Sequence, residues 1–301
     1  MVKSRSSKIG DWVVVLICVF VIMLCVLPML NLLAQSLSSA QSVINRKVMF
    51  LPMLHNTGDN SHNFGITMES YRYVFLDPAF ARSMWWTAIL TVICTLVSLS
   101  MTILCAYPLT YGWLRGKSVI NILIIFTMYF SAGTIPNYVL MKSLGLLNNP
   151  LVLIIPNCLS VFNMIILRSF FFGVPDSLRE SAEIDGANPF TVLVRIYLPL
   201  STPVLATLAL FYAVGRWNGF SDALMYINAA PQWVPIQLKL WQLINNQTSI
   251  EVTEMVANTV PRASDAIKAA AIMFATVPIL IVYPWLQRYF IAGVTIGAVK
   301  G

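Results

Sequence analysis

The spacing of charged residues divides the chain into long apolar runs separated by polar segments. Six intervals between consecutive charges are long enough to cross a bilayer, because a charge at the bilayer centre is costly and about 20 apolar residues are needed for one crossing. These intervals predict transmembrane helices over residues 12–36, 83–110, 118–141, 150–171, 197–221 and 269–288. The pattern therefore predicts an all-α, polytopic membrane protein with six transmembrane helices.

Composition agrees with a membrane protein and argues against a nucleic-acid-binding one. Of 301 residues, 58% are hydrophobic and 10% are charged, whereas soluble domains are about 45–50% apolar. The net charge is +7, but Lys and Arg are spread between apolar runs, and a nucleic-acid surface would need them on one face. We expect the lipid bilayer, and no nucleic acid, to be the partner of this basic charge.

The first apolar run has two explanations, a retained helix or a secretory signal. Basic residues precede it and Ser38-Ser39-Ala40 resembles a cleavage site. The run is longer than the roughly 7–15 residues of a signal core, which favours a retained helix. Six crossings place both termini on one side, and the density of Lys and Arg favours the cytoplasm.

The expected organisation has three parts. They are residues 1–36 as cytoplasmic N-terminus and first helix, 37–82 as an extracytoplasmic loop, and 83–301 as a five-helix core, which contains an extracytoplasmic loop at 222–268 and a cytoplasmic C-terminal tail.

Residues with catalytic or metal-binding chemistry are few and scattered. The five cysteines lie in apolar runs without a CxxC pair, as packed thiols do, and the two histidines share a polar loop that offers too few further ligands. Residues 112–118 (GWLRGKS) resemble a phosphate-binding loop, but they are one residue short between the glycines and follow a membrane helix. The sequence thus predicts a non-catalytic chain that binds no metal or cofactor.

Residues 175–199 (PDSLRESAEIDGANPFTVLVRIYLP) form a polar segment between two predicted membrane helices and hold four of the twelve acidic residues. Ser177 and Glu180 fit a capping box at a helix start, and Gly186 fits a left-handed helix end. Asn188 followed by Pro189 fits the start of a second helix. We expect a rigid helix of two to three turns. Capping alone leaves open whether this helix binds a partner or is only solvated.

The same segment resembles the EAA motif of ABC-importer permeases. The matching positions are Glu180, Ser181 (usually Ala in the family), Ala182, Glu183, Asp185, Gly186, Ala187, Ile196, Leu198 and Pro199. Trp217-Asn218 and the C-terminal run 287–301 are similar to the carbohydrate-uptake, MalG-type branch, and within it to permeases for aldouronate, pectin-derived or alginate oligosaccharides. The resemblance covers most of the chain from about residue 83 onward.

This resemblance implies a subunit of a type I importer in the bacterial cytoplasmic membrane. It implies a second, usually different permease as channel partner, two cytoplasmic ATPase subunits that bind the ATP and Mg, and an extracytoplasmic solute-binding protein. Residues 176–190 would be the coupling helix, which lies in a cleft of the ATPase and transmits its movement.

Polar residues within the predicted membrane helices are candidates for the sugar path, because such residues usually face a bundle interior or a water-filled cavity. They are Asn157, Asn163, Tyr212, Arg216, Trp217 and Asn218. The two asparagines are six residues apart, which on a continuous helix leaves at most one of them facing the path. Hydrogen bonding between helices, and an interfacial aromatic belt for Trp217, explain these residues equally well.

The leading hypothesis is a permease subunit of an ATP-driven oligosaccharide importer. One alternative is an ABC importer permease for a non-sugar solute, and the carbohydrate-type C-terminal run argues against it. Another alternative is an ion-coupled secondary transporter, which predicts an acidic residue in mid-span or an inverted repeat. A membrane-embedded enzyme would need a nucleophile or a metal constellation, and the sequence offers neither.

Overall fold

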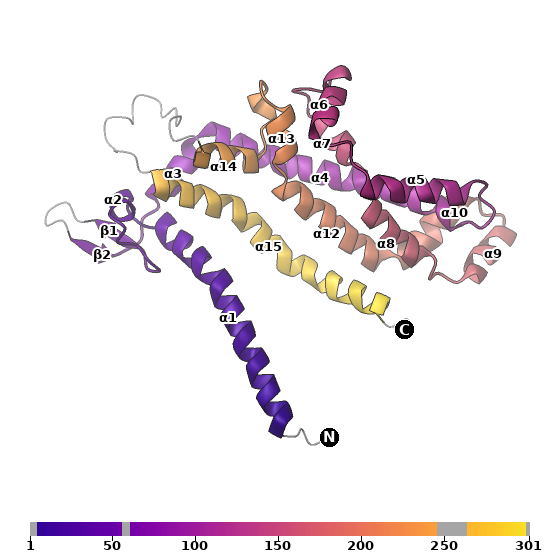
Figure 1. Ribbon diagram of the computed structural model, residues 1–301, viewed down its shortest axis with the longest axis horizontal. Helices are drawn as coiled ribbons and strands as arrows, with labels where there is room; N and C mark the ends of the chain where they lie inside the picture. Colours follow the sequence, from indigo (N-terminus) through magenta and orange to yellow (C-terminus); the bar gives the residue numbers. More distant parts are fainter. Residues whose placement is uncertain (1–4, 56–60, 246–263, 299–301) are drawn as a thin grey trace. The chain divides into compact units, whose positions relative to one another are not determined.

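The computed structural model describes residues 5–55, 61–245 and 264–298, which are mostly helical (Figure 1). The chain divides into two compact units. Unit 1 comprises residues 1–81 and 240–277, and unit 2 comprises residues 82–239 and 278–301. The all-α prediction needs one amendment, because unit 1 contains a two-stranded antiparallel sheet of β1 (Met53–His55) and β2 (His62–Phe64).

Unit 1 begins with the long helix α1 (Arg5–Ser36), followed by α2 (Ala40–Ile44), the β1–β2 hairpin and α3 (Glu69–Leu76). Two serine hydroxyls in the turn between α1 and α2 join the hairpin to the helices. Ser38 Oγ accepts from the backbone N–H of Met53, and Ser39 Oγ accepts from that of His55, each at 3.0 Å. The predicted loop 37–82 is thus a small ordered structure in the part that is described.

Unit 2 is built from short helices around the long α4. In chain order the elements are α4 (Pro78–Ala106), η1 (Pro108–Thr110), α5 (Lys117–Tyr129), α6 (Thr134–Ser143), α7 (Leu151–Ile154), η2 (Ile155–Asn157), α8 (Val161–Phe171), α9 (Asp176–Ile184), α10 (Pro189–Val192), the π-helical η3 (Leu193–Tyr197), α11 (Leu198–Leu200), α12 (Thr202–Asn218), α13 (Ser221–Tyr226), η4 (Pro231–Trp233), α14 (Ile236–Asn245) and α15 (Ser264–Ala298). The first residues of α4 and much of α14 and α15 belong to unit 1.

Three helices are long and apolar enough to cross a membrane, namely Asp11–Ser36, Pro78–Thr110 and Asp265–Val282. Three further predicted helices are broken into bent pairs, so the described chain has three to six candidate spans. The bends are 113° between α5 and α6, 48° between Leu151–Asn157 and α8, and 84° between Pro189–Leu200 and α12.

Glycine and proline account for the three breaks. Gly133 precedes α6 with φ of 87°, a conformation that glycine adopts without strain. Pro156 lies in η2, and Pro199 and Pro203 flank the bend at Ser201. Because proline lacks an N–H and its ring clashes with the preceding turn, each proline weakens a continuous helix at these points.

Two predicted loop segments are helical where the structure describes them. The 222–268 segment contains α13, η4, α14 and the start of α15, and its residues 246–263 lie outside the described residues. The predicted C-terminal tail from residue 288 belongs to α15, which continues to Ala298. A charged residue such as Arg288 marks the end of an apolar run but does not end a helix.

The interior of unit 2 holds two apolar clusters. One joins the end of α4 and η1 to α8, α10 and α12, and includes Tyr107, Leu167, Val192 and Leu208. The other joins α4 to α7, α13 and α14. The first cluster supports α9 and α10, while residues between the two clusters line a cavity.

Candidate functional site

The helix in the EAA-like segment is α9, and it begins two residues earlier than the capping box requires. Asp176 is the first helical residue and Pro175 occupies the cap position, where no side chain accepts a hydrogen bond. The predicted capping role of Ser177 is therefore wrong, because this residue lies inside the helix. Asp176 instead pairs with Arg179 at 2.9 Å, one turn along.

The C-terminal end of α9 agrees with the sequence prediction. Gly186 has φ of 84°, in the left-handed region. Its N–H donates to the carbonyl of Glu183, and the N–H of Ala187 donates to that of Ala182, which is the Schellman pattern. Asn188 then caps α10, because its side chain accepts from Thr191 N at 2.8 Å. Both ends of this turn are thus closed by hydrogen bonds.

Four aromatic side chains beneath α9 and α10 form an aromatic cluster of Tyr107, Tyr111, Phe171 and Tyr197. The Arg179 guanidinium lies over the Tyr111 ring, 5.2 Å from its centre. Tyr107 Oη donates to the carbonyl of Pro189 at 3.0 Å and lies 2.6 Å from Tyr111 Oη. These contacts attach both helices to the end of α4 and η1.

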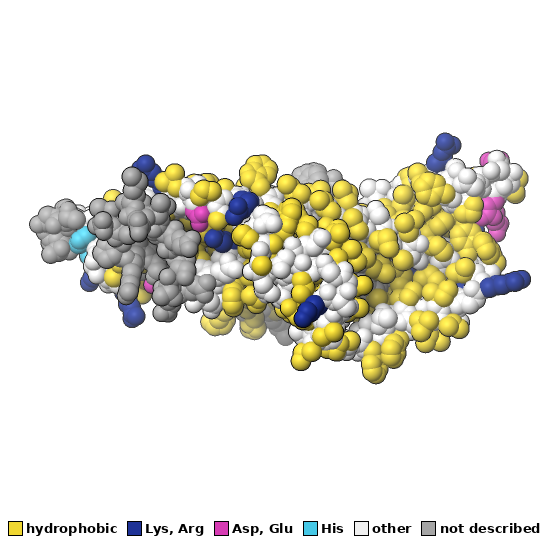
Figure 2. Space-filling view, turned by 90° about the horizontal axis from the view of Figure 1, so that it is seen from above, with side chains coloured by type: hydrophobic (Ala, Val, Ile, Leu, Met, Phe, Trp, Pro, Cys, Tyr) yellow, Lys and Arg dark blue, Asp and Glu magenta, His cyan; other side chains and the backbone are white. Residues whose placement is uncertain are grey.

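The two faces of α9 differ in exposure. Residues one turn apart on its outer side, Ser177, Glu180, Ser181 and Ile184, are all exposed, with Ile184 at 86%. We call these four residues the outer stripe. Ala182 is half-buried and packs on the cluster beneath, so it contacts its own chain. Figure 2 shows acidic and basic side chains together at the α9 end of unit 2.

The remaining EAA-like positions are divided between the surface and the interior. Ala187, Ile196 and Leu198 are partly buried and pack against the first apolar cluster. Glu183, Asp185 and Pro199 are exposed. Phe190, just beyond the turn, is 66% exposed although it is large and apolar. The segment therefore presents charged and apolar groups side by side, as a docking surface does.

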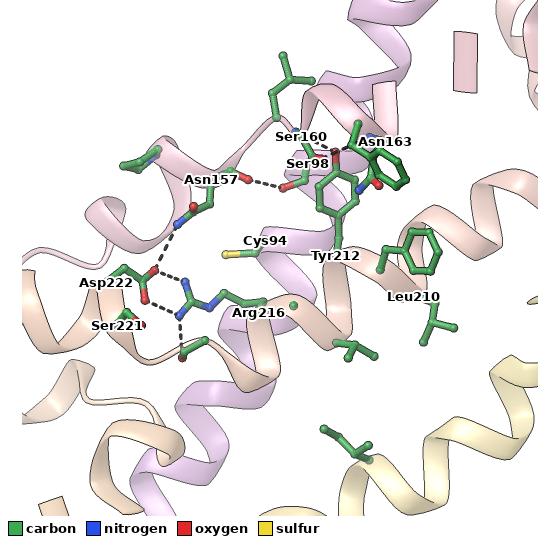
Figure 3. Close-up of a pocket in the computed structure, with 18 residues that line it drawn as sticks. Cys94, Ser98, Asn157, Ser160, Asn163, Leu210, Tyr212, Arg216, Ser221 and Asp222 are labelled. Atoms are coloured by element: carbon green, nitrogen blue, oxygen red, sulfur yellow. Dashed lines mark hydrogen bonds and ion pairs between the residues drawn. The ribbon is translucent and has the colours of Figure 1, made fainter. Parts of the chain in front are cut away.

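A cavity of about 1150 Å³ lies between α4, η2, α8, α12 and α13. Figure 3 shows its polar side chains converging from these elements. Four of the six predicted path residues line it: Asn157, Asn163, Tyr212 and Arg216. Ser98, Ser160, Ser221 and Asp222 add further polar groups. The volume lies slightly above the range for small-ligand sites, about 300–1,000 Å³.

Both asparagines line this cavity because the helix that carries them is broken. The prediction that at most one of them faces the path assumed a continuous helix. Residues 158–160 separate η2 from α8, and the two segments meet at 48°. Asn157 at the end of η2 and Asn163 near the start of α8 therefore point into one cavity (Figure 3).

A buried ion pair lies at one side of the cavity. Arg216 binds Asp222 through both terminal nitrogens, with Nη1–Oδ2 at 2.5 Å and Nη2–Oδ1 at 3.1 Å. Asn157 Nδ2 donates to the same carboxylate at 3.2 Å. Arg216 also donates to the carbonyls of Leu153 and Gly219. The pair thereby connects α7, η2, α12 and α13.

Tyr212 organises the opposite side of the cavity. Its hydroxyl lies 2.6 Å from Thr102 Oγ1 on α4 and accepts from the backbone N–H of Ser160 at 3.1 Å. Trp217 and Asn218 are not among the residues that line the cavity. Trp217 is buried beside a separate apolar cavity of about 280 Å³, and Asn218 is exposed.

Sequence reasoning missed Asp222 and the aromatic cluster. Asp222 lies six residues after Arg216, which is not a helical pairing distance, and the chain turns at Gly219 to bring the two together. The available signal was an acidic residue, Asp222, just beyond the end of the predicted membrane helix that carries Arg216. Tyr107 and Tyr111, four residues apart, carried no signal that separated them from interfacial aromatics. Among the described residues, no three His, Cys, Asp or Glu side chains are grouped to hold a metal ion.

Comparison with known proteins agrees with this architecture. Residues 4–296 match the family described as binding-protein-dependent transport system inner membrane component. The chain is 38% identical to the polygalacturonan/rhamnogalacturonan transport system permease protein YtcP of Bacillus subtilis, over 93% of this chain and 94% of that protein. It is 40% identical to Protein LplC of the same organism, over 100% and 98%.

A solved structure is also similar in fold and sequence. It is the crystal structure of a bacterial ABC transporter involved in the import of the acidic polysaccharide alginate, with a TM-score of 0.87, 31% identity, and coverage of 96% of this chain and 99% of that chain. The family match spans nearly the whole chain and includes α9, the cavity and the broken helices. The protein therefore belongs to the inner membrane component family of binding-protein-dependent transport systems.

Proposed function

We propose that the chain is the permease subunit of an ATP-driven, binding-protein-dependent importer of oligosaccharides. The observation that carries this proposal is full-length similarity to a polygalacturonan/rhamnogalacturonan permease and to an alginate importer chain. The cavity supports it, because hydroxyl, amide and aromatic groups line it together. The chain then forms half of the translocation channel in the cytoplasmic membrane, and a second, different permease forms the other half.

In this proposal α9 is the coupling helix and its outer stripe docks in a cleft of the ATPase. A lever has to be stiff to transmit movement. The Schellman turn at Gly186, the Asn188 cap and the contacts of Arg179 and Tyr107 supply that stiffness. ATP and Mg are bound and hydrolysed in the partner ATPase, and a solute-binding protein delivers the sugar from outside.

The function is tested by reconstituting the whole importer in proteoliposomes with its second permease, ATPase and solute-binding protein. We expect ATP-dependent uptake of a labelled oligosaccharide. Uptake of a peptide, an amino acid or phosphate, without uptake of any oligosaccharide, would show that the solute class is wrong. Uptake that follows an ion gradient and needs no ATP would instead support a secondary transporter.

Coupling through α9 is tested by Glu180→Lys. Glu180 is exposed on the outer stripe, so reversing its charge should leave folding intact and disturb only a docked partner. We expect sugar-stimulated ATP hydrolysis to fall to the basal rate. Glu69→Lys is the matched control, since Glu69 is an exposed glutamate in the first turn of α3. Normal stimulation in Glu180→Lys would refute the docking surface.

A further inference from the structure

Arg216 and Asp222 are the charged side chains among the described residues that line the cavity. Their charges are opposite, so these lining residues carry no net charge. The pair is mostly enclosed, with side chains 7% and 20% exposed. Solvent screens such a pair weakly, and the two groups act on a cargo as a compact dipole rather than as separate ions.

The hydrogen-bonding face of Arg216 is already occupied by protein. Its two terminal nitrogens donate to Asp222 and to the carbonyls of Leu153 and Gly219. The remaining donor, Nε, is buried and has no partner among the described groups. Carboxylates bind arginine most strongly through two parallel hydrogen bonds. A sugar carboxylate therefore cannot take this bidentate position while Asp222 holds it.

The carboxylate of Asp222 is equally well satisfied. It accepts from both terminal nitrogens of Arg216, from Asn157 Nδ2 and from the backbone N–H of Ala223. The aspartate is thus held in place by three elements, η2, α12 and α13. Its position next to the guanidinium is part of the fold, and the neutralisation of Arg216 does not depend on a mobile side chain (Figure 3).

The rest of the described lining is uncharged. Hydroxyl and amide groups alternate with aromatic rings, from Ser98, Ser160, Asn163, Tyr212, Ser221, Phe162 and Phe211. The hydroxyls of a sugar can form hydrogen bonds with these hydroxyl and amide groups. The apolar faces of the sugar ring can pack on the aromatic side chains. A carboxylate would lose its hydration here and gain no counter-charge from these groups.

Resting on the proposed function, we infer that Asp222 is a specificity-determining residue for the charge of the transported sugar. Its carboxylate cancels the charge of Arg216, so that this side of the cavity does not hold uronate units more strongly than uncharged sugar units. Loss of that carboxylate would leave a guanidinium uncompensated in a poorly screened cavity, which attracts anions strongly.

The test compares two trisaccharides that differ only in their carboxylates, galactotriose and trigalacturonate. Equilibrium binding is measured on the whole importer without its solute-binding protein, so that the selectivity of that protein does not enter. In Asp222→Asn we expect the affinity for trigalacturonate relative to galactotriose to rise by about tenfold or more, and to fall again with added salt. Removing both charges in R216Q/D222N should return the ratio to the wild-type value.

Asp265→Asn is the matched control, since it makes the same charge change in the first turn of α15, outside the cavity lining. The inference would be overturned if the ratio of the two affinities, trigalacturonate over galactotriose, stayed within about twofold of the wild-type value in Asp222→Asn. If this variant does not assemble, Arg216→Gln leaves Asp222 as the uncompensated charge and should lower the ratio. An unchanged affinity ratio in Arg216→Gln also refutes the inference. Failure of both trisaccharides to bind the importer refutes it as well. The proposed function is judged separately, by ATP-dependent oligosaccharide uptake in the wild type.

Discussion

Arg179 in α9 and Arg216 in α12 both pair with carboxylates, but the carboxylates that pair with Arg179 are exposed and the one that pairs with Arg216 is largely enclosed. Arg179 lies 2.9 Å from Asp176 and 3.8 Å from Glu183, whose side chains are 74% and 44% exposed. The Arg216–Asp222 pair is 7% and 20% exposed. Exposed pairs contribute about 0–1 kcal/mol each, whereas breaking a buried pair from one side costs about 3–5 kcal/mol.

This difference separates the two regions by what holds them together. The surface helix α9 depends on its turn geometry and on packing against the aromatic cluster, and its ion pairs add little. One side of the cavity depends on an ion pair that joins four elements. Substitutions that remove a single charge should therefore have large effects in the cavity and small effects on α9.

The largest effect is expected for Asp222→Ala. It leaves the Arg216 charge buried without a partner, so the free energy of unfolding should fall by about 3–5 kcal/mol. The free energy of unfolding is measured by titrating SDS into the purified chain in mixed micelles, under conditions where unfolding is reversible. The double variant Arg216→Met/Asp222→Leu removes both charges and should lose much less. Equal losses in the single and double variants would contradict a role for charge compensation.

An intermediate effect is expected for Gly186→Val. A Cβ at this position meets no atom within 4 Å, so the penalty of about 1–2 kcal/mol comes from the left-handed backbone alone. The end of α9 should fray, and sugar-stimulated ATP hydrolysis should be lost while the helices remain inserted. Gly112→Val is the control, because Gly112 also has free space but no positive φ. Full stimulation in Gly186→Val would argue against a stiff coupling helix.

The smallest effect is expected for Asp176→Asn. The Asp176 side of the ion pair with Arg179 is exposed to solvent, so the pair adds less than about 1 kcal/mol, and the helix dipole adds a similarly small amount. Thermal unfolding of the whole importer at low and high salt should show a small loss that disappears at high salt. A loss as large as that of Asp222→Ala would remove the contrast between the two regions.

Local backbone chemistry explains which details of α9 could be predicted from sequence. The Gly186 turn and the Asn188 cap each depend on a few neighbouring residues, and both predictions are confirmed. The capping box failed because Pro175 can end the preceding segment and start α9 at Asp176. A shift of two residues at a helix start changes which side chain reaches the free N–H groups.

Apolar length located the candidate membrane segments but not their breaks. Pro156, Pro199 and Gly133 were visible in the sequence as helix-weakening residues. A proline permits a kink, but the bends of 48° and 84° depend on the helices packed around each one. The prediction that Asn157 and Asn163 face apart was wrong for this reason.

The sequence by itself determined a membrane-type helical chain, the position of the EAA-like segment and the geometry of its glycine turn, since these depend on composition and local chemistry. Tertiary structure alone decided the cavity. Arg216 and Asp222 are not spaced to meet on one helix, and only the turn at Gly219 and the packing of α12 and α13 against α7 and η2 join them. The contacts that place this pair in the cavity join segments distant in sequence and leave no local pattern, so its position there could be seen only in the folded chain.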